Sequence, residues 1–278
     1  MPSNDVLTNS ALKNRLIDSL KLLLIPGIGL KRYKVLVEEL GSPGAVLGSS
    51  VARLGSLPRI SENLAEAVHS SETAREATEI AARIIQLGWE VKFLGDDDYP
   101  QLLSKIADPP PLLFCVGSTA PTVELRIAIV GTRRASEQGR TFASNLARAL
   151  VENGITVVSG MAEGIDSAAH TGALEAGGRT IAVWGSSLDI VYPSSNRTLA
   201  ERIKGSGAVY SEYLPGTRPD TSTFPARNRI ISGLSEGVVV VEAGVKSGAL
   251  ITASHALDQE REVFAVPGSP VSRSSQGT

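Results

Sequence analysis

Four short segments of this 278-residue chain combine glycines with basic side chains in a way that suits anion binding. Exposed backbone N–H groups at a glycine turn before a helix attract anions, and guanidinium and ammonium groups bind phosphate oxygens directly. We therefore expect these segments to bind phosphate groups. The segments are Gly131-Thr132-Arg133-Arg134, Ser159-Gly160-Met161-Ala162-Glu163-Gly164-Ile165-Asp166, Phe224-Pro225-Ala226-Arg227-Asn228-Arg229 and Lys246-Ser247-Gly248-Ala249.

The third segment is the most informative, because it places cations near the start of a predicted helix. Pro225 suits the first helical position, which puts Arg227 and Arg229 in the first turn. Cations there oppose the helix dipole by roughly 0.3–1 kcal/mol each, so stability alone favours acidic residues. A bound anion would reverse this effect. Alternatively, the two arginines pair with Asp220 or Glu212, or their stems cover apolar surface.

Acid–base catalysis is a second chemistry that the residue types allow. Asp166 and His170 lie four positions apart, on one face of a predicted helix. However, the chain lacks a nucleophile elbow, a GxxxxGK[ST] phosphate loop, a complete GxGxxG dinucleotide turn and any metal-ligand spacing. We therefore expect structural roles for the acidic residues, with no catalytic site, no cofactor and no metal. The residues considered are Glu163, Asp166, His170, Asp189 and Glu242.

From residue 126 onward, short apolar strands alternate strictly with amphipathic helices. This pattern predicts an α/β domain with a Rossmann-like, doubly wound, mainly parallel sheet that helices cover on both faces. Ligands of such sheets bind at the carboxyl edge of the strands, where we expect the four segments to converge. The predicted strands are 127–131, 155–160, 180–185, 207–213, 237–243 and 262–268, and the predicted helices lie around 137–152, 165–176, 195–204, 226–235 and 248–259.

The N-terminal part has a helical pattern. Leucines recur every four residues from Leu12 to Leu24, the segment Pro26-Gly27-Ile28-Gly29 ends that helix, and a second apolar face follows. This is a helix–hairpin–helix pattern, and Leu57-Pro58-Arg59-Ile60 looks like a degenerate second copy. The glycines either bring backbone N–H groups to DNA phosphates or only permit a tight turn. We expect a helical domain over 1–75, a connecting segment over 76–125 and the sheet domain over 126–278.

The composition narrows the classes of function. With 27 Lys+Arg and 29 Asp+Glu the formal net charge is −2, which excludes a polybasic protein but allows a local basic patch. A hydrophobic fraction of 42% predicts a folded chain rather than a disordered one. The single cysteine excludes a disulfide framework and fits a reducing cytoplasm, and no apolar run reaches the roughly 20 residues that span a bilayer. Because the aromatics are only five Phe, five Tyr and two Trp, a nucleic-acid site must depend on phosphate contacts more than on base stacking.

Several long motifs resemble the DNA-processing protein A family, also called DprA or Smf, of bacterial natural transformation. The resemblance runs almost continuously from Arg126 to Gly268, and YPQLLSKIADPPPLLFCVG before it is also similar. The motifs are VGTRRAS, VVSGMAEGIDSAAHTGAL, GGRTIAVWGSSLDIVYPSSN, SEY, FPARNRIISGLS, VVVVEAGVKSGALITASHAL and REVFAVPG.

The resemblance implies a cytoplasmic protein that binds and protects single-stranded DNA and loads the recombinase RecA onto it. It also implies a homodimer, no established catalytic activity, and a sterile-alpha-motif-like helical domain before the sheet domain. The DNA-contacting positions that it implies are Gly131, Arg133, Ser159, Gly160, Gly164, Arg227, Asn228, Arg229, Lys246, Ser247 and Gly248.

The sequence departs from the family pattern at two points. Glu163 stands where relatives often have a basic residue, which puts one phosphate contact in doubt, and relatives continue beyond Thr278 into a further helix or a winged-helix domain. The alternative is a Rossmann-like nucleotide-processing enzyme of the phosphoribohydrolase type. Those enzymes carry a glutamate soon after a glycine-rich turn, whereas the first carboxylate after Gly248 is Asp258.

Overall fold

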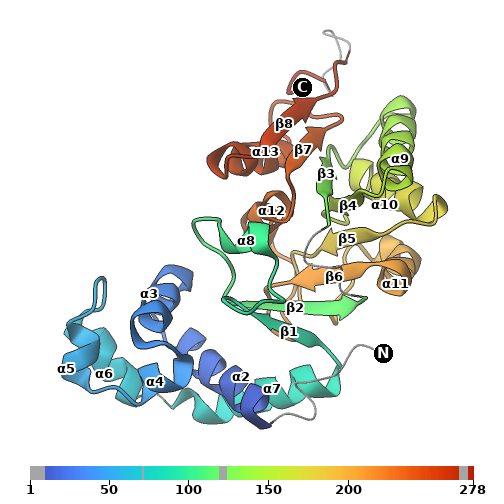
Figure 1. Cartoon of the computed structure of the whole chain (residues 1–278). Coiled ribbons are helices and arrows are strands. Elements are labelled where there is room, and N and C mark those ends of the chain that lie inside the picture. The colour runs from blue at the N-terminus through green and yellow to red at the C-terminus, as the bar shows by residue number, and fades with distance from the viewer. Residues whose placement is uncertain (1–9, 71, 119–123, 269–274) are drawn as a thin grey trace. The chain divides into compact units, whose positions relative to one another are not determined.

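The computed structural model describes residues 10–70, 72–118, 124–268 and 275–278 (Figure 1). Its contacts divide the chain into two compact units. The first extends to Leu94 and includes Asp108–Leu112, and the second comprises Gly95–Ala107 and the chain from Leu113 onward. Helix α7 (Thr73–Gln86), which the sequence placed mainly in a connecting segment, packs on α2 (Ser10–Leu23) and belongs to the first unit.

The first unit is a bundle of short helices around a leucine-rich core. The core contains Leu22, Leu36, Leu54 and Leu64, all of which are buried. Two of the short helices begin at serine N-caps, which satisfy backbone N–H groups of the first turn. Besides α2 and α7, the unit contains α3 (Leu30–Leu40), α4 (Pro43–Leu47), α5 (Val51–Gly55), α6 (Glu62–Ser70) and the strand β1 (Glu90–Phe93).

The second unit is built on a twisted sheet in the order β2-β6-β5-β4-β3-β7-β8. All its neighbouring strands are parallel except β2, which runs antiparallel to β6. The predicted doubly wound, mainly parallel sheet is confirmed, and β2 is an addition that the sequence had not assigned. The strands are β2 (Leu112–Gly117), β3 (Arg126–Val130), β4 (Thr156–Ser159), β5 (Thr180–Val183), β6 (Ala208–Ser211), β7 (Gly237–Val240) and β8 (Glu262–Ala265).

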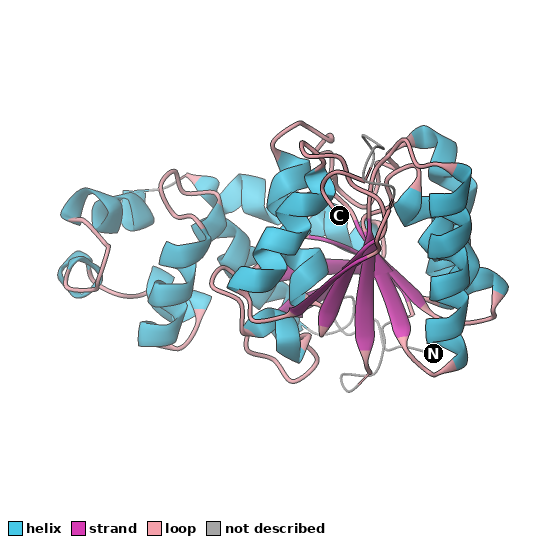
Figure 2. Ribbon diagram, turned by 90° about the horizontal axis from the view of Figure 1, so that it is seen from above, coloured by secondary structure: helices cyan, strands magenta, loops and turns pink. Residues whose placement is uncertain are grey.

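Helices cover both faces of this sheet, as Figure 2 shows. Alanines such as Ala143 and Ala169 let the helices on one face pack closely against Ile129 and Val157 of the strands. On this face lie α9 (Glu137–Glu152), α10 (Ile165–Glu175) and α11 (Arg197–Ser206), the last preceded by the 3₁₀ turn η1 (Ser194–Asn196). The other helices of the unit are α8 (Gln101–Ser104), α12 (Thr223–Gly233) and α13 (Gly248–Asp258), and α12 packs against both others.

The order of the strands creates the position of the site. From β3 the chain moves outward through β4, β5 and β6, and then returns to place β7 on the other side of β3. The loops after β3 and β7 therefore leave the sheet in opposite directions, which opens a crevice at their carboxyl ends.

Candidate nucleic-acid interface

A pocket of about 660 Å³ lies at the carboxyl edge of the sheet, and all four predicted segments contribute to its wall. Seven of the predicted residues line it: Gly131, Arg133, Arg227, Asn228, Lys246, Ser247 and Gly248. Gly160 lines a smaller adjoining cavity of about 100 Å³ together with Glu163. Ser159, Gly164 and Arg229 are not part of either lining.

Two glycines bring the β3 and β4 loops into close contact. A Cβ atom on Gly131 would lie 2.5 Å from Cγ1 of Ile165, so only glycine fits there without a shift. Gly164 has a φ of 82°, in the left-handed region that favours glycine, and it packs against the carbonyl group of Thr132. The N–H of Thr132 also donates to the carbonyl oxygen of Glu242 at 2.7 Å. The β3 turn that carries Arg133 is therefore fixed from two sides.

Three exposed cations surround the mouth of the pocket. Arg133, Arg134 and Lys246 all line it, and within the described part of the chain none of them forms an ion pair with an acidic side chain. Helix α13 begins beside Lys246 with Ser247 as its N-cap and has no acidic residue in its first turn. The site thus offers uncompensated positive charge and helix N–H groups, both of which attract an anion.

Two aromatic residues form one wall of the pocket: Tyr192, which lies outside the four predicted segments, and Phe224, which belongs to the third segment but was given no role there. The side chain of Tyr192 is 45% exposed, and its ring centroid lies 5.4 Å from that of Phe224. The guanidinium carbon of Arg133 lies 5.0 Å from the Phe224 ring centroid, a cation–π contact. The expectation of a site with little capacity for base stacking followed from the small total of aromatics. The relevant signal was their position directly before Pro193 and Pro225, in the loop after β5 and at the start of α12.

Arg227 lies at the floor of the pocket and is only 4% exposed. Its Nη1 donates to the carbonyl oxygens of Val183 and Gly160, the latter at 2.8 Å, while its buried Nε has no partner among the described residues. Burial lowers the pKa of Arg227 to about 10, against the opposing charge of Asp166, so the guanidinium stays charged at neutral pH. The pocket therefore has a fixed positive charge beneath it.

Asp166 holds the loop after β4 in place. Its Oδ2 accepts the N–H groups of Gly160 and Ala162, each at 3.2 Å. Burial raises the pKa of Asp166 to about 6, although the nearby charge of Arg227 and the accepted hydrogen bonds oppose this. Asp166 is thus a loop anchor at neutral pH.

His170 is part of the core of α10 and lies outside the pocket. Its Nδ1 is 2.7 Å from Oγ1 of Thr180, whose hydroxyl donates to the carbonyl oxygen of Val157. Since that hydroxyl has only one hydrogen, the Nδ1 of His170 must be the donor of the pair. Burial lowers the pKa of His170 to about 3, so the ring is neutral.

The position of the two arginines in α12 corrects the sequence analysis. The helix begins at Thr223, so Pro225 is its third residue, Arg227 its fifth and Arg229 its seventh. The prediction that both arginines lie in the first turn is therefore wrong. The dipole effect falls off within one turn, so it gives no evidence for an anion at these positions.

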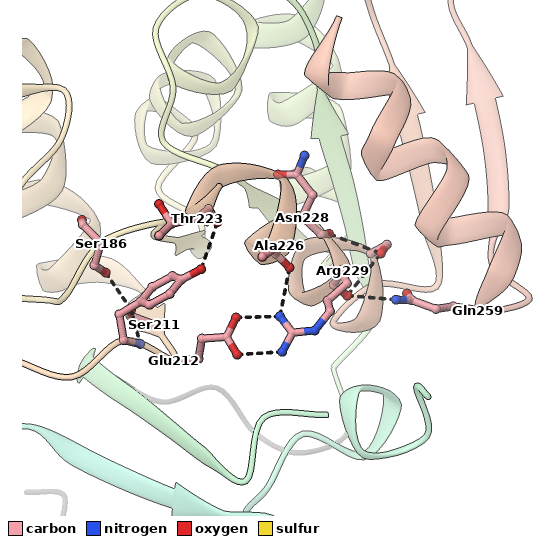
Figure 3. Close-up of polar contacts among 10 residues, drawn as sticks. Ser186, Ser211, Glu212, Thr223, Ala226, Asn228, Arg229 and Gln259 are labelled. Carbon is pink, nitrogen blue, oxygen red and sulfur yellow. Dashed lines mark hydrogen bonds and ion pairs between the residues drawn. The ribbon is translucent and has the colours of Figure 1, made fainter. Parts of the chain in front are cut away.

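Arg229 forms the ion pair that the sequence analysis had left open as an alternative. Its Nη1 and Nη2 donate to the two carboxylate oxygens of Glu212, each at 2.6 Å (Figure 3). Nη1 also donates to the carbonyl oxygen of Ala226 at 2.9 Å, and the side chain of Gln259 donates to the carbonyl oxygen of Arg229. The pair is buried, with side-chain exposures of 6% for Arg229 and 12% for Glu212. It joins α12 to the end of β6.

The remaining acidic and polar candidates also have local partners. Glu242 accepts the N–H of Ser136, Glu163 accepts the hydroxyl of Ser195, and Asp189 accepts the N–H of Gly216. The hydroxyl of Ser159 is buried and donates to the carbonyl oxygen of Ile129, and Asn228 donates to the carbonyl oxygen of Gly248. In the described residues no group of three or more His, Cys, Asp or Glu is placed to hold a metal ion. None of the described helices is long and apolar enough to cross a membrane.

Comparisons with known proteins identify the family to which the chain is similar. The model of the family described as DNA recombination-mediator protein A matches residues 90–278. The DNA processing protein DprA of Streptococcus pneumoniae is 47% identical over 182 residues, which cover 66% of this chain and 64% of that protein. Protein Smf of a Synechocystis strain is 46% identical over 186 residues, covering 66% of this chain and 47% of that protein. The chain thus spans about half to two thirds of the length of these relatives.

Two solved structures are similar in fold. The crystal structure of DNA processing protein A from Streptococcus pneumoniae aligns with a TM-score of 0.75 and 35% identity, covering 96% of this chain and 89% of that one. A structure of DNA processing protein A from Helicobacter pylori, described for its single-stranded DNA binding mode, aligns with a TM-score of 0.60 and 32% identity. That alignment covers 67% of this chain and 85% of the Helicobacter chain.

Proposed function

The chain belongs to the DNA recombination-mediator protein A family, and from that premise we propose that it binds single-stranded DNA in the pocket at the sheet edge. The observation that carries the proposal is the placement of unpaired cations beside an aromatic wall in one pocket. Cations bind phosphates of any nucleic acid, but exposed rings can stack only on bases that are free of a partner strand. The Helicobacter pylori relative, whose structure concerns single-stranded DNA binding, supports this choice of ligand.

Each part of the pocket has its own role in the proposal. Arg133, Lys246 and the N–H of Gly248 at the start of α13 bind phosphates, and the hydrogen bond from Asn228 to the carbonyl oxygen of Gly248 holds that helix start in place. Tyr192 and Phe224 stack against bases. Because Arg133 lies over the Phe224 ring, it binds a phosphate and also holds that ring in place. Arg227 and Asp166 act from below, by fixing the loop of Gly160.

We infer that the protein is not an enzyme. The candidate carboxylates accept hydrogen bonds from backbone N–H groups or serine hydroxyls of nearby loops. In addition, α13 has no acidic residue in its first turn, where the phosphoribohydrolase type of chemistry needs one. A protein that holds a strand without cleaving it fits the proposed role in natural transformation. In that role it protects incoming DNA in the cytoplasm and loads RecA onto it. Membership of the family supports this step from DNA binding to a role in recombination.

We also propose that the protein forms a homodimer through β8 and α13. β8 ends the sheet within the described residues, and exposed apolar side chains lie on and near it. An unpaired strand edge with apolar side chains is a ready surface for a second chain. The exposed residues are Val245, Leu257 and Phe264.

A binding assay with two matched variants tests the proposed site. Fluorescence anisotropy with a labelled oligothymidine measures the affinity of the full chain and of Arg133→Ala/Lys246→Ala. We expect a loss of roughly a hundredfold, because two charge-assisted contacts contribute about 2.7 kcal/mol. Arg148→Ala/Arg202→Ala, which removes two cations of α9 and α11 that do not line the pocket, is the control. Equal losses in both variants would contradict the proposed site.

A further inference from the structure

The first unit contains the same hairpin twice. One copy joins α2 to α3 and the other joins α5 to α6. In each copy an isoleucine N–H donates to the carbonyl oxygen three residues earlier, and the residue before that isoleucine has a positive φ, 93° at Gly27 and 65° at Arg59. The corresponding residues are Ile25 and Leu57, Pro26 and Pro58, Gly27 and Arg59, and Ile28 and Ile60.

Arg32 joins the two hairpins. Its Nη1 donates to the carbonyl oxygen of Gly27 at 2.7 Å, and its Nε donates to the carbonyl oxygen of Arg59 at 3.0 Å. The two turns are therefore held beside each other by one guanidinium group, and Arg59 is placed next to the start of α3.

A basic hollow of about 530 Å³ lies at this junction. Lys31 and Arg59 are exposed, and neither forms an ion pair within the part of the chain that the structure describes. The first turn of α3 has no acidic residue, whereas the equivalent turn of α6 contains Glu62. The lining consists of Gly29, Leu30, Lys31, Arg32, Arg59 and Asp108, which gives three cations and one carboxylate.

We propose that this basic hollow binds the sugar-phosphate backbone of double-stranded DNA. Its cations match phosphate oxygens, which duplex DNA presents at high density along its surface. No aromatic residue is among those that line the hollow, so it has no ring on which an unpaired base could stack. Contacts limited to phosphates position a duplex without identifying its sequence. The pocket at the sheet edge differs from this hollow because aromatic rings lie beside its cations.

The internal repeat supplies substitutions that preserve the fold. Lys31→Asn introduces the residue that the second hairpin has at the equivalent position, Asn63. Arg59→Gly introduces the residue of the first hairpin, Gly27, and glycine is compatible with the positive φ of Arg59. The control Arg75→Ala/Arg83→Ala removes the same charge from exposed positions of α7. Arg32 is left unchanged because it holds the two turns together.

Fluorescence anisotropy of the full chain with a labelled duplex and with oligothymidine, over a range of salt concentrations, tests the proposal. For Lys31→Asn/Arg59→Gly we expect duplex affinity to fall roughly a hundredfold, as for the other loss of two charge-assisted contacts. The slope of the logarithm of affinity against that of salt should fall by about 1.8, since each duplex phosphate contact contributes about 0.9. Affinity for oligothymidine and the melting temperature should stay at wild-type values, and the α7 control should bind both ligands normally.

Three results would overturn the proposal. Unchanged duplex affinity in Lys31→Asn/Arg59→Gly would show that the hollow does not bind duplex DNA. An equal loss of duplex and oligothymidine affinity would assign the hollow to single strands instead. Loss of duplex binding in Arg133→Ala/Lys246→Ala, with the hairpin variant normal, would place the duplex in the pocket at the sheet edge. If Arg133→Ala/Lys246→Ala bound oligothymidine normally, the proposed single-strand site would be wrong, but the conclusions about duplex binding in the hollow would not change.

Discussion

Replacing Arg229 by alanine tests whether this arginine stabilises the fold or contacts DNA. The substitution leaves the Glu212 carboxylate, which is only 12% exposed, without the two hydrogen bonds of 2.6 Å that it now accepts. Breaking a buried pair by removing one partner destabilises a protein by about 3–5 kcal/mol, because an uncompensated charge remains in the interior. We therefore expect Arg229→Ala to lower the free energy of unfolding by about that amount, measured by urea denaturation.

A second variant distinguishes the effect of the uncompensated buried charge on stability from the effect of lost side-chain packing. In Arg229→Met/Glu212→Leu no charge remains, so we expect most of the lost stability to return. Under native conditions the folded fraction of Arg229→Ala should bind oligothymidine with wild-type affinity, because Arg229 does not line the pocket. A variant that keeps full stability but loses DNA affinity would refute this reasoning and make Arg229 a DNA contact.

Three further outcomes follow from the site. Burial raises the pKa of Asp166 to about 6, so the folded protein binds more protons than the unfolded chain between about pH 4 and pH 6. The free energy of unfolding should therefore fall by up to about 3 kcal/mol as the pH rises through this range. Urea denaturation at pH 4 and pH 7 measures this change, which should be absent in Asp166→Asn. Tyr192→Leu and Phe224→Leu should each weaken oligothymidine binding by about 1–3 kcal/mol and leave the salt slope unchanged, whereas a changed slope would show lost phosphate contacts instead. Incubation with nucleoside monophosphates or ATP should release neither base nor phosphate, and turnover that disappears in Glu242→Gln would identify an enzyme.

The sequence predicted the second unit well because its strands and helices are specified locally. Nearly uniform apolar strands and amphipathic helices alternate from residue 126, and each observed element overlaps its predicted range. The convergence of the four segments followed from topology alone, since the carboxyl ends of parallel strands share an edge. The strand β2 was missed because its antiparallel partner β6 follows much later in the chain and no local signal connects them.

The parts of the site that the sequence did not predict depend on contacts between distant residues. The pairing of Arg229 with Glu212 remained one of several alternatives, because only the fold brings the end of β6 beside α12. The start of α12 at Thr223 moves both arginines out of the first turn. The aromatic wall arises because the loop after β5 places Tyr192 beside Phe224 at the start of α12. A count of residue types cannot detect such a local concentration.

Photocrosslinking locates the bound strand most directly. An oligothymidine containing 5-iododeoxyuridine, which crosslinks preferentially to nearby aromatic side chains, is irradiated with the full chain, and the modified peptides are identified by mass spectrometry. Binding in the proposed pocket predicts crosslinks at Tyr192 or Phe224 that disappear in Arg133→Ala/Lys246→Ala, while duplex DNA gives none at these positions. Crosslinks confined to the first unit, or equal yields at Tyr192 from single and double strands, would contradict the proposal that the pocket at the sheet edge holds single-stranded DNA.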